Sequence, residues 1–485
     1  MDALETDTIT MITAIAILSI DIIIRIVLLF YIPRNRKPTA ALAWLFAIAL
    51  IPIGATVLFF IIGRTRLSKK RLAKQEAINN LYNRHNRTLH RMNLDAMPES
   101  PYDTTAKLAE SLAFLAPTKG NTVRIMSGYD TIIADMTKAV LRAKSYVYVE
   151  FFAMTLDDST KEFFAALALA RERGLQVHVL FDTLGSRKYP GYRKMKRFLS
   201  KAGIQWRKML PIRLTPGRYN RPDLRNHRKI VVIDNTDAYI GSLNMVDKTY
   251  HRKDDISYIE LVSHITGPAV NEAAAVFASD WYAETNQLLR HFTKNSLQSV
   301  TGKTVAQVLP SGPGYAYRNN LKVFVDLIYT AKRSVVITNP YLVPDESLLA
   351  ALTTVALRGI KVTILNSEAM DQWMVGHAQR SYYEQLIDAG VQIWLYPKPQ
   401  LMHSKYMAVD NEVAIIGSSN LDIRSFELNH ECSLIAYDPA IAKHLHQQHL
   451  SDLKRSKQIE LNTWRKRSRR SQLLDSIARL TSALQ

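Results

Sequence analysis

The pattern of apolar residues sets the first 75 residues apart from the rest of the chain. Two runs, 9–32 and 40–62, contain almost no charged side chains. Each is longer than the ~20 residues that an α-helix needs to cross the hydrocarbon core of a bilayer. We therefore expect residues 1–75 to form a membrane anchor with two hydrophobic spans.

Basic residues flank both apolar runs and bear on the orientation of the anchor. Arg34, Arg36 and Lys37 lie between the runs, and a larger basic cluster within 64–74 follows the second run. Because basic flanks tend to stay in the cytoplasm, the larger cluster predicts that the long C-terminal part is cytoplasmic. The three residues between the runs oppose that topology, so a re-entrant hairpin is the alternative.

Two charges, Asp21 and Arg25, lie inside the first run. They are one helical turn apart, so in a helix they can pair with each other. A charge inside a span also raises the alternative of a role in substrate access. A cleaved signal peptide does not fit, because the N-terminus is acidic, the run is too long and a second run follows.

Beyond residue 75 one succession of patterns occurs twice: an alternating strand, an amphipathic helix, a glycine and an apolar strand. These segments are 145–152, 161–173 and 175–181 in the first copy, and 334–341, 347–358 and 360–365 in the second. Strand, helix and strand joined by short turns are typical of parallel α/β units. We expect an α/β fold of two duplicated lobes, 76–290 and 291–485, each a mixed sheet flanked by helices.

Each copy also carries the same polar motif, HxKxxxxD followed by GSxN. In the first copy its residues are His227, Lys229, Asp234, Ser242 and Asn244. In the second copy they are His403, Lys405, Asp410, Ser418 and Asn420, at the same spacing. Two matches of this length in equivalent places of a duplicated chain indicate one site built on a pseudo-two-fold axis.

The residue types in this motif suit a phosphate ligand. Residues two apart on a strand share a face, so each histidine projects with its lysine. The lysine neutralises phosphate oxygens, the histidine is available as nucleophile or proton carrier, and the asparagine can donate hydrogen bonds. With two copies, one histidine can attack phosphorus while the other protonates the leaving alkoxide and later deprotonates the incoming alcohol. Asp234 and Asp410 each end an apolar strand before an asparagine, where a turn-forming, structural aspartate is expected.

The paired HxKxxxxD motifs resemble the phospholipase D superfamily, and the resemblance is closer to its cardiolipin synthase branch. The segments that carry the closer resemblance are Thr39–Trp44, Asn226–Ile230, Pro340–Ser347, Gly417–Phe426 and Leu428–Glu431. This resemblance covers nearly the whole chain. It implies two phospholipase D-type lobes and a phosphohistidine intermediate formed without a metal or another cofactor.

The family also carries an acidic residue after each motif, proposed to orient a catalytic histidine. Glu431 fits that position in the second copy. In the first copy Glu260 is the candidate and Asp255 competes with it, because the pair before Glu260 departs from the family pattern. By analogy with two-lobed relatives, in which the first-lobe histidine is often the nucleophile, we expect His227 to attack phosphorus.

The resemblance implies transfer of a phosphatidyl group from one phosphatidylglycerol to a hydroxyl of another, giving cardiolipin and glycerol. Phosphatidylethanolamine as the second lipid stays open. A hydrolytic phospholipase D would share every catalytic residue and is the alternative function. The expected place of a cardiolipin synthase is the bacterial plasma membrane, here as a multi-pass protein with cytoplasmic lobes; the sequence defines no oligomeric state.

Charge narrows the choice of partner. Lys and Arg number 63 against 43 Asp and Glu, a net charge of +20 that favours a polyanionic partner, either nucleic acid or an anionic membrane. The apolar runs favour anionic phospholipid, and a nuclease of the same superfamily has less support. The single cysteine, Cys432, excludes an internal disulfide and a thiolate metal site.

The C-terminal tail leaves two alternatives open. Its basic run 464–470 precedes an amphipathic stretch, 473–484. The tail either lies on the bilayer or packs on the protein as a terminal helix with a solvated charge run. The tyrosines and methionines scattered through both lobes are expected to be packing residues rather than lipid contacts.

Overall fold

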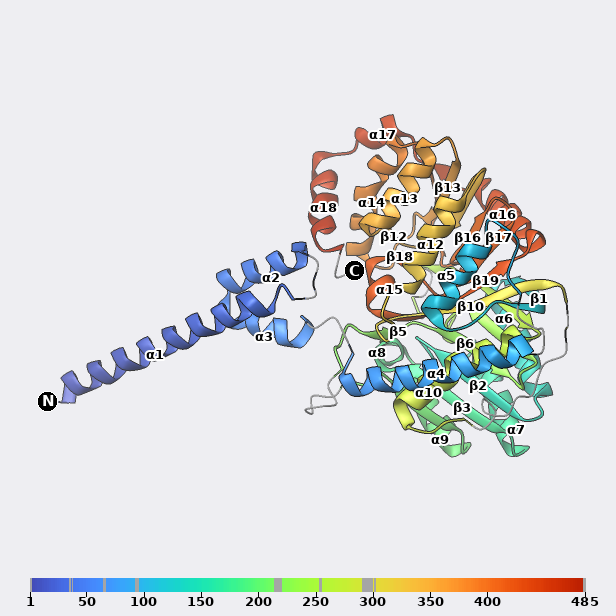
Figure 1. The fold of residues 1–485 in the computed structure, drawn as a ribbon, viewed down its shortest axis with the longest axis horizontal. Helices are drawn as coiled ribbons and strands as arrows, with labels where there is room; N and C mark the ends of the chain where they lie inside the picture. The colour runs from blue at the N-terminus through green and yellow to red at the C-terminus, as the bar shows by residue number, and fades with distance from the viewer. Residues whose placement is uncertain are drawn as a thin grey trace. The chain divides into compact units, whose positions relative to one another are not determined.

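The computed structural model describes residues 2–34, 36, 38–63, 67–91, 96–212, 220–252, 255–289, 300 and 302–482 (Figure 1). The chain forms two compact units. The small unit contains residues 1–66 and 221–223, and the large unit contains 67–220 and 224–485.

The small unit begins with helix α1 (Asp2–Tyr31). Its part Thr8–Tyr31 is, among the described residues, the one helix long and apolar enough to cross a membrane. Within it the Nε of Arg25 donates to Oδ2 of Asp21 at 2.7 Å, which confirms the predicted pairing of these two charges.

The second apolar run forms two helices instead of the single span that its length predicted. These are α2 (Pro38–Leu50) and α3 (Pro52–Ile62), 13 and 11 residues long. Pro52 lacks a backbone N–H and disfavours a helical conformation at Ile51, which has φ −132° and ψ 74°. At 1.5 Å per residue, about 20 Å for the longer helix, neither helix crosses the ~30 Å hydrocarbon core.

Helices α2 and α3 form a hairpin that returns the chain to its starting end. Phe59, near the end of α3, lies with its ring centroid 5.3 Å from that of Trp44 and 6.2 Å from that of Tyr31. The guanidinium of Arg36, which precedes α2, lies 4.5 Å from the Phe59 ring. The residues before α2 and the end of α3 are therefore neighbours.

A mixed sheet of sixteen strands among the described residues runs through the large unit (Figure 1). In the first half its strands are β1 (Thr118–Ser127), β2 (Tyr146–Phe151), β3 (Gln176–Asp182), β4 (Gln205–Met209), β6 (Lys229–Ile233), β7 (Asp237–Gly241) and β9 (Leu261–Thr266). In the second half they are β10 (Thr304–Ser311), β11 (Ser334–Thr338), β13 (Lys361–Ser367), β14 (Gln392–Tyr396), β16 (Tyr406–Val409), β17 (Val413–Gly417) and β19 (Asn429–Tyr437). The sheet also includes β5 (Arg225–Asn226) beside β19 and the edge strand β20 (Lys457–Gln458).

The strand order confirms the duplication. From one edge the first half reads β4-β3-β2-β6-β7-β9-β1. From the other edge, after the short strand β20, the second half reads β14-β13-β11-β16-β17-β19-β10. The two series meet where β1 pairs antiparallel with β10. The halves thus share one continuous sheet.

Helices cover both faces of this sheet, and alternation along β2 explains the two layers. Val147, Val149 and Phe151 point into a core with helices α6 (Tyr129–Arg142), α7 (Lys161–Glu172) and α9 (Tyr192–Lys201). Tyr146 and Tyr148 point to the opposite face, where α10 (Ala269–Thr285) packs. In the second half α12 (Asn319–Thr330), α13 (Glu346–Leu357) and α14 (Trp373–Asp388) cover one face and α16 (Pro439–Leu453) the other.

Two helices near the start of the large unit cross the boundaries that the sequence suggested. α4 (Lys69–Arg91) spans the expected boundary after residue 75, and the hydroxyl of Tyr82 on this helix donates to Ala275 O of α10 at 2.8 Å. α5 (Asp103–Ala113) lies within 76–290 but packs on α12 of the second half, where Thr105 Oγ1 donates to Asp326 Oδ2 at 2.6 Å. The halves are therefore interlocked, because each uses segments from outside its repeat.

Candidate active site

Each motif histidine lies between a short strand that pairs with the other half and a strand that belongs to its own half. Strand β5 pairs in parallel with β19 of the second half, and the backbone N–H of His227 donates to His430 O at 2.8 Å. The chain then enters β6 of its own half. In the second half, β15 (Gln400–Met402) pairs with β8 (Ser257–Ile259), and the N–H of His403 donates to Ile259 O at 2.9 Å. Both histidines therefore precede strands β6 and β16, whereas the sequence interpretation placed them within a strand.

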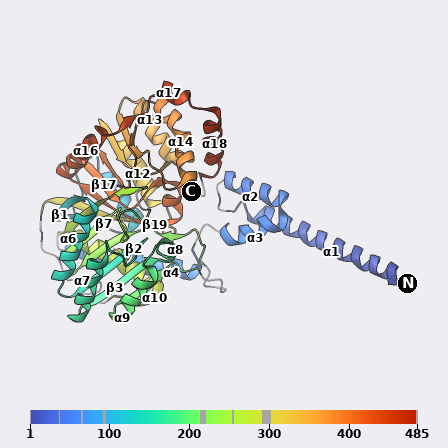
Figure 2. The same ribbon diagram turned by 180° about the vertical axis from the view of Figure 1, so that it is seen from behind.

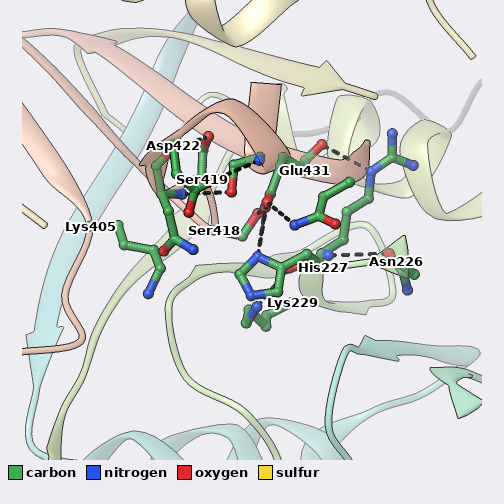
Figure 3. Close-up of polar contacts among 12 residues, drawn as sticks. Asn226, His227, Lys229, Lys405, Ser418, Ser419, Asp422 and Glu431 are labelled. Carbon is green, nitrogen blue, oxygen red and sulfur yellow. Dashed lines mark hydrogen bonds and ion pairs between the residues drawn. The ribbon is translucent and has the colours of Figure 1, made fainter. Parts of the chain in front are cut away.

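Each histidine is paired with the glutamate of the opposite half. His227 Nδ1 lies 2.9 and 3.0 Å from the two carboxylate oxygens of Glu431 (Figure 3). His403 Nδ1 lies 2.8 and 2.9 Å from those of Glu260. Asp255, the competing candidate, forms an ion pair with Arg252 and its side chain is 58% exposed. The geometry therefore selects Glu260 over Asp255 as the partner of a histidine.

The serine of each GSxN segment holds one of these glutamates. Ser242 Oγ donates to Glu260 Oε2 at 2.5 Å, and Ser418 Oγ donates to Glu431 Oε2 at 2.5 Å. Both serine oxygens also accept a backbone N–H, from Leu261 at 2.9 Å and from the residue after Glu431 at 3.0 Å. The serines contact the carboxylates, although the sequence interpretation allowed them to contact phosphate.

The glycine before each serine permits this close contact. A Cβ atom on Gly417 would overlap the backbone of β19 at Cys432 and Ser433. One on Gly241 would overlap β9 at Leu261 and Val262. Only a residue without a side chain lets the serine strand approach the glutamate strand this closely.

Both motif lysines are buried beside their histidines. Lys229 Nζ donates to His227 O and Lys405 Nζ donates to His403 O, each at 2.7 Å. Burial lowers the pKa of Lys229 to about 7, although Glu431 acts to raise it. Burial lowers the pKa of Lys405 to about 8, with Glu260 acting in the opposite direction. Two buried amino groups, whose positive charge an anion nearby would stabilise, are therefore held next to the histidines.

The two asparagines differ in their surroundings. Asn244 Oδ1 accepts from Ala153 N at 3.1 Å, and its Nδ2 donates at 2.7 Å to the hydroxyl of Tyr250. That hydroxyl donates to Glu260 Oε1 at 3.1 Å. Asn420 Oδ1, in contrast, is buried and has no hydrogen-bond partner among the described residues. The side-chain amide of Asn420 therefore makes fewer hydrogen bonds to the protein than that of Asn244.

Asp234 and Asp410 lie at the far ends of β6 and β16, away from the histidines. The carboxylate of Asp234 accepts the backbone N–H groups of residues 144–146. Asp410 accepts those of residues 332–334 at 2.7–2.8 Å. Each aspartate has a positive φ, 52° and 55°, and closes the turn into the next strand. This geometry fits the structural role that the sequence favoured for both.

Burial makes both histidines neutral at neutral pH. The pKa of His227 is well below its ordinary value because of burial, reinforced by the charges of Lys229 and Lys405. Burial also lowers the pKa of His403, although Glu260 opposes this shift. An ionised carboxylate only accepts hydrogen bonds, so beside Glu260 it is Nδ1 of His403 that carries the proton, and Nε2 keeps a free lone pair. The same holds for His227 when Glu431 is ionised.

The two glutamates differ in charge state. Burial acts to raise the pKa of Glu260, but His403, Lys405 and Ser242 outweigh it and lower the pKa to about 2. Burial raises the pKa of Glu431 to about 7, against the effects of Lys229 and Ser418. The two histidine–glutamate pairs are therefore similar in geometry and unequal in electrostatics.

Both histidines and both asparagines line one cavity of about 1060 Å³. Its aromatic lining includes Phe152, Tyr189, Tyr250, Tyr258 and Tyr341. The sequence interpretation assigned the tyrosines to packing, and for these four it missed the cavity. Their positions in the sequence have no fixed spacing from the motifs that would distinguish them from other tyrosines. Only Tyr341 lies in a segment that carried the family resemblance.

The described residues hold no group of three or more His, Cys, Asp or Glu side chains arranged as metal ligands. The polar lining of the cavity includes the two imidazoles and the side chains of Arg225, Arg252 and Arg424, which suit a phosphate ester.

A family model described as "Cardiolipin synthase, PLD-like domain" matches residues 136–281 and 324–453, more than half of the chain. The chain belongs to the cardiolipin synthase family. A cardiolipin synthase of Halalkalibacterium halodurans is 32% identical over 460 residues, which cover 93% of this chain and 90% of the relative. Cardiolipin synthase A of Proteus mirabilis is 28% identical, with 94% and 95% covered.

The fold of this cardiolipin synthase family member also occurs in a solved structure, the phosphatidylserine synthase of Haemophilus influenzae. The two superpose with a TM-score of 0.60 at 14% identity, over 80% of this chain and the whole of the other. This similarity confirms the two-lobed phospholipase D-type fold.

Proposed function

We propose that the protein is a cardiolipin synthase that transfers a phosphatidyl group between two phosphatidylglycerol molecules. The observation that carries this proposal is the pair of histidines that line one cavity, each bound to a glutamate of the other half and each next to a buried lysine. A phosphodiester placed there would meet nucleophile, proton carrier and positive charge together.

In the first step one histidine attacks phosphorus through Nε2. The new N–P bond replaces the P–O bond to the headgroup glycerol. The other histidine enters this step as an imidazolium, having taken up a proton at Nε2 from solvent, and gives that proton to the leaving glycerol oxygen. The resulting phosphoimidazole carries positive charge, which the glutamate at Nδ1 stabilises.

In the second step the proton-carrying histidine removes a proton from the headgroup hydroxyl of a second phosphatidylglycerol. The alkoxide attacks phosphorus, a P–O bond replaces the N–P bond, and cardiolipin leaves. A cavity of about 1060 Å³ is at the upper end of ligand sites, which suits two lipid headgroups in turn.

The unequal electrostatics support His227 as the nucleophile and His403 as the proton carrier. The pKa of His227 is the more strongly lowered, which keeps its lone pair free. Glu260, ionised because its pKa is lowered to about 2, stabilises a protonated His403. Lys229, Lys405 and Asn420 would bind the phosphate oxygens, while Glu431 and Ser418 orient His227.

The proposed place of action is the bacterial plasma membrane, with α1 as the spanning helix and α2–α3 as a re-entrant hairpin. The contacts of Phe59 with Tyr31 and of Arg36 with Phe59 bring the chain back to the end of α1. In this arrangement both basic clusters would lie on the same side of the membrane, which supports cytoplasmic lobes.

The proposal is tested by expressing the full chain in bacterial cells that lack cardiolipin, followed by lipid extraction and mass spectrometry. Wild type should produce cardiolipin, and His227→Ala and His403→Ala should not. His444→Ala, an exposed histidine on α16, is the matched control and should behave as wild type. Phosphatidic acid without cardiolipin would replace the synthase with a hydrolytic phospholipase D.

A further inference from the structure

The C-terminal helix α18 (Arg469–Leu480) is fixed to the second half by one face. Asp475 and Ala478 on that face are buried. Asp475 Oδ1 lies 2.6 Å from Nδ1 of His377 on α14, and its Oδ2 accepts from Arg467 Nη1 at 2.6 Å. The helix is therefore part of the folded unit, as one of the two alternatives for the tail predicted.

The opposite face of α18 is apolar and exposed. Leu473, Leu474, Ile477 and Leu480 are exposed by 61%, 40%, 50% and 85%. Their spacing of three and four residues places them together on one side of the helix. Large aliphatic side chains gathered in this way favour contact with an apolar partner over water.

Exposed apolar side chains also line the cavity next to α18. Trp373 and Met374 begin α14, are 60% and 38% exposed, and line the cavity. Thr481, the residue after α18, lines it as well. Lipid that enters the cavity at this wall would pass along exposed apolar side chains.

Basic residues border the same face. Lys466, Arg469 and Arg470 precede or begin α18, are exposed and form no ion pair with a described residue. Basic residues beside an apolar helix face, with tryptophan among the apolar residues, are the composition of helices that lie in the headgroup region of anionic bilayers. The chain as a whole, at +20, complements such a surface.

We propose that Leu473, Leu474, Ile477 and Leu480 of α18, together with Trp373 and Met374, form a membrane-docking surface. It lies against the headgroup and upper acyl region of a bilayer that contains anionic phospholipid. Docking holds the cavity mouth at the lipid surface, so a headgroup reaches the histidines while its acyl chains stay in the bilayer. The inference rests on the proposed function only in taking lipid as substrate.

The first experiment measures where α18 lies when the full chain is in a bilayer. Leu480→Cys, labelled with an environment-sensitive fluorophore, is reconstituted into vesicles of phosphatidylglycerol and phosphatidylcholine. Leu169→Cys, on α7 of the first half, is the matched exposed control, and the two views of the fold place α7 and α18 at opposite ends of the large unit (Figures 1 and 2). Unmutated protein controls for labelling of Cys432, which is buried.

The label at position 480 should shift to shorter emission wavelength in these vesicles and be quenched by lipids that carry a quencher on the acyl chain. The label at position 169 should do neither. Water-like emission at 480 in vesicles would overturn the proposal. A shift that also occurs in detergent and depends on protein concentration would assign the surface to contact with a second copy instead. None of these readouts requires activity, so they are independent of the synthase assignment.

The second experiment separates docking from catalysis. A triple variant that replaces three apolar residues of α18 by serine should raise the apparent KM for phosphatidylglycerol in vesicles several-fold. Its substitutions are Leu473→Ser, Ile477→Ser and Leu480→Ser. The same variant should leave kcat/KM unchanged on a short-chain phosphatidylglycerol below its critical micelle concentration. The control Leu141→Ser/Leu169→Ser, two exposed leucines of the first half, should change neither. Equal losses on both substrates would refute docking and indicate damage to the cavity.

Discussion

Glu431 binds Nδ1 of His227 from 204 positions further along the chain, at 2.9 Å, across the junction of the two halves. Glu260 binds His403 in the reciprocal sense. Each proposed catalytic pair thus takes its histidine and its carboxylate from different halves. Four expectations follow from this arrangement, from the turn that Asp410 closes and from the α2–α3 hairpin.

A change at a glutamate should reproduce the defect of the opposite half's histidine. We expect Glu431→Gln and Glu260→Gln each to lower kcat by about 10²-fold or more, the usual contribution of acid–base catalysis. A phosphatidyl ester of p-nitrophenol needs no proton to release its leaving group. With it, changes in the His227–Glu431 pair should abolish the p-nitrophenol burst, whereas changes in the His403–Glu260 pair should preserve a burst and block turnover.

Stopped-flow absorbance measures that burst, and mass spectrometry of trapped enzyme locates the phosphorylated histidine. The nucleophile assignment fails if the burst survives in His227→Ala and is lost in His403→Ala. The crossed pairing fails if Glu431→Gln behaves as His403→Ala does.

The pH dependence of kcat/KM should be a narrow bell near neutrality. Below its pKa of about 7, Glu431 gains a proton and no longer stabilises the positive phosphoimidazole on His227. Above about 7, and then about 8, Lys229 and Lys405 lose their protons and no longer neutralise the phosphate. Activity should therefore fall on both sides.

Steady-state kinetics from pH 5 to 10 would measure this profile. The range extends beyond the ordinary pKa of a glutamate carboxyl toward that of a lysine amine, so both limbs of the bell fall within it. Glu431→Gln should lose the acid limb while it keeps the alkaline one, because the amide does not titrate. An unchanged acid limb in that variant would assign the limb to another group.

Asp410 should matter for stability and little for chemistry. Its carboxylate accepts three backbone N–H groups just before and at the start of β11, so Asp410→Ala leaves three half-buried donors without this partner. We expect a loss of about 3 kcal/mol in the free energy of unfolding and a clearly lower Tm. Differential scanning fluorimetry in detergent measures it, and kcat per folded molecule should stay near wild type.

Asp410→Asn is the conservative control, because asparagine tolerates the positive φ of 55° and keeps one acceptor oxygen. It should lose less stability than the alanine variant. A folded Asp410→Ala enzyme without activity would show that the aspartate takes part in the reaction.

The re-entrant hairpin predicts that residues 34 and 68 face the same compartment. Arg34→Cys and Ser68→Cys should both resist a membrane-impermeant maleimide in intact cells and react after permeabilisation. Thr8→Cys, at the start of the spanning part of α1, should react in intact cells. Labelling of position 34 in intact cells would contradict the re-entrant hairpin and support an anchor with two complete membrane spans.

Local signals in the sequence predicted a large part of this molecule. The alternation in 145–152 and 334–341 predicted β2 and β11. The two faces of each of these strands pack against different helices, so successive side chains differ. Pro52 also gave a local signal for the break between α2 and α3, but the length of the apolar run outweighed it.

Long-range features had no such signal. The pairing of His403 with Glu260 depends on β15 lying beside β8, and α5 joins the second half only through contacts with α12. The tyrosines of the cavity reach it from separate segments, Tyr258 from β8 and the other three from loops. In each case residues far apart in the chain are brought together by tertiary packing, which periodicity and spacing do not encode.

The antiparallel seam between β1 and β10 has an evolutionary consequence. If the chain arose by doubling of one ancestral repeat, a lone repeat held a histidine whose carboxylate partner lay on another molecule. Such an ancestor was competent only as a symmetric homodimer, joined through the same strand of each subunit. Fusion then freed the two copies to diverge, and the unequal environments of Asn244 and Asn420 record how far that divergence has gone.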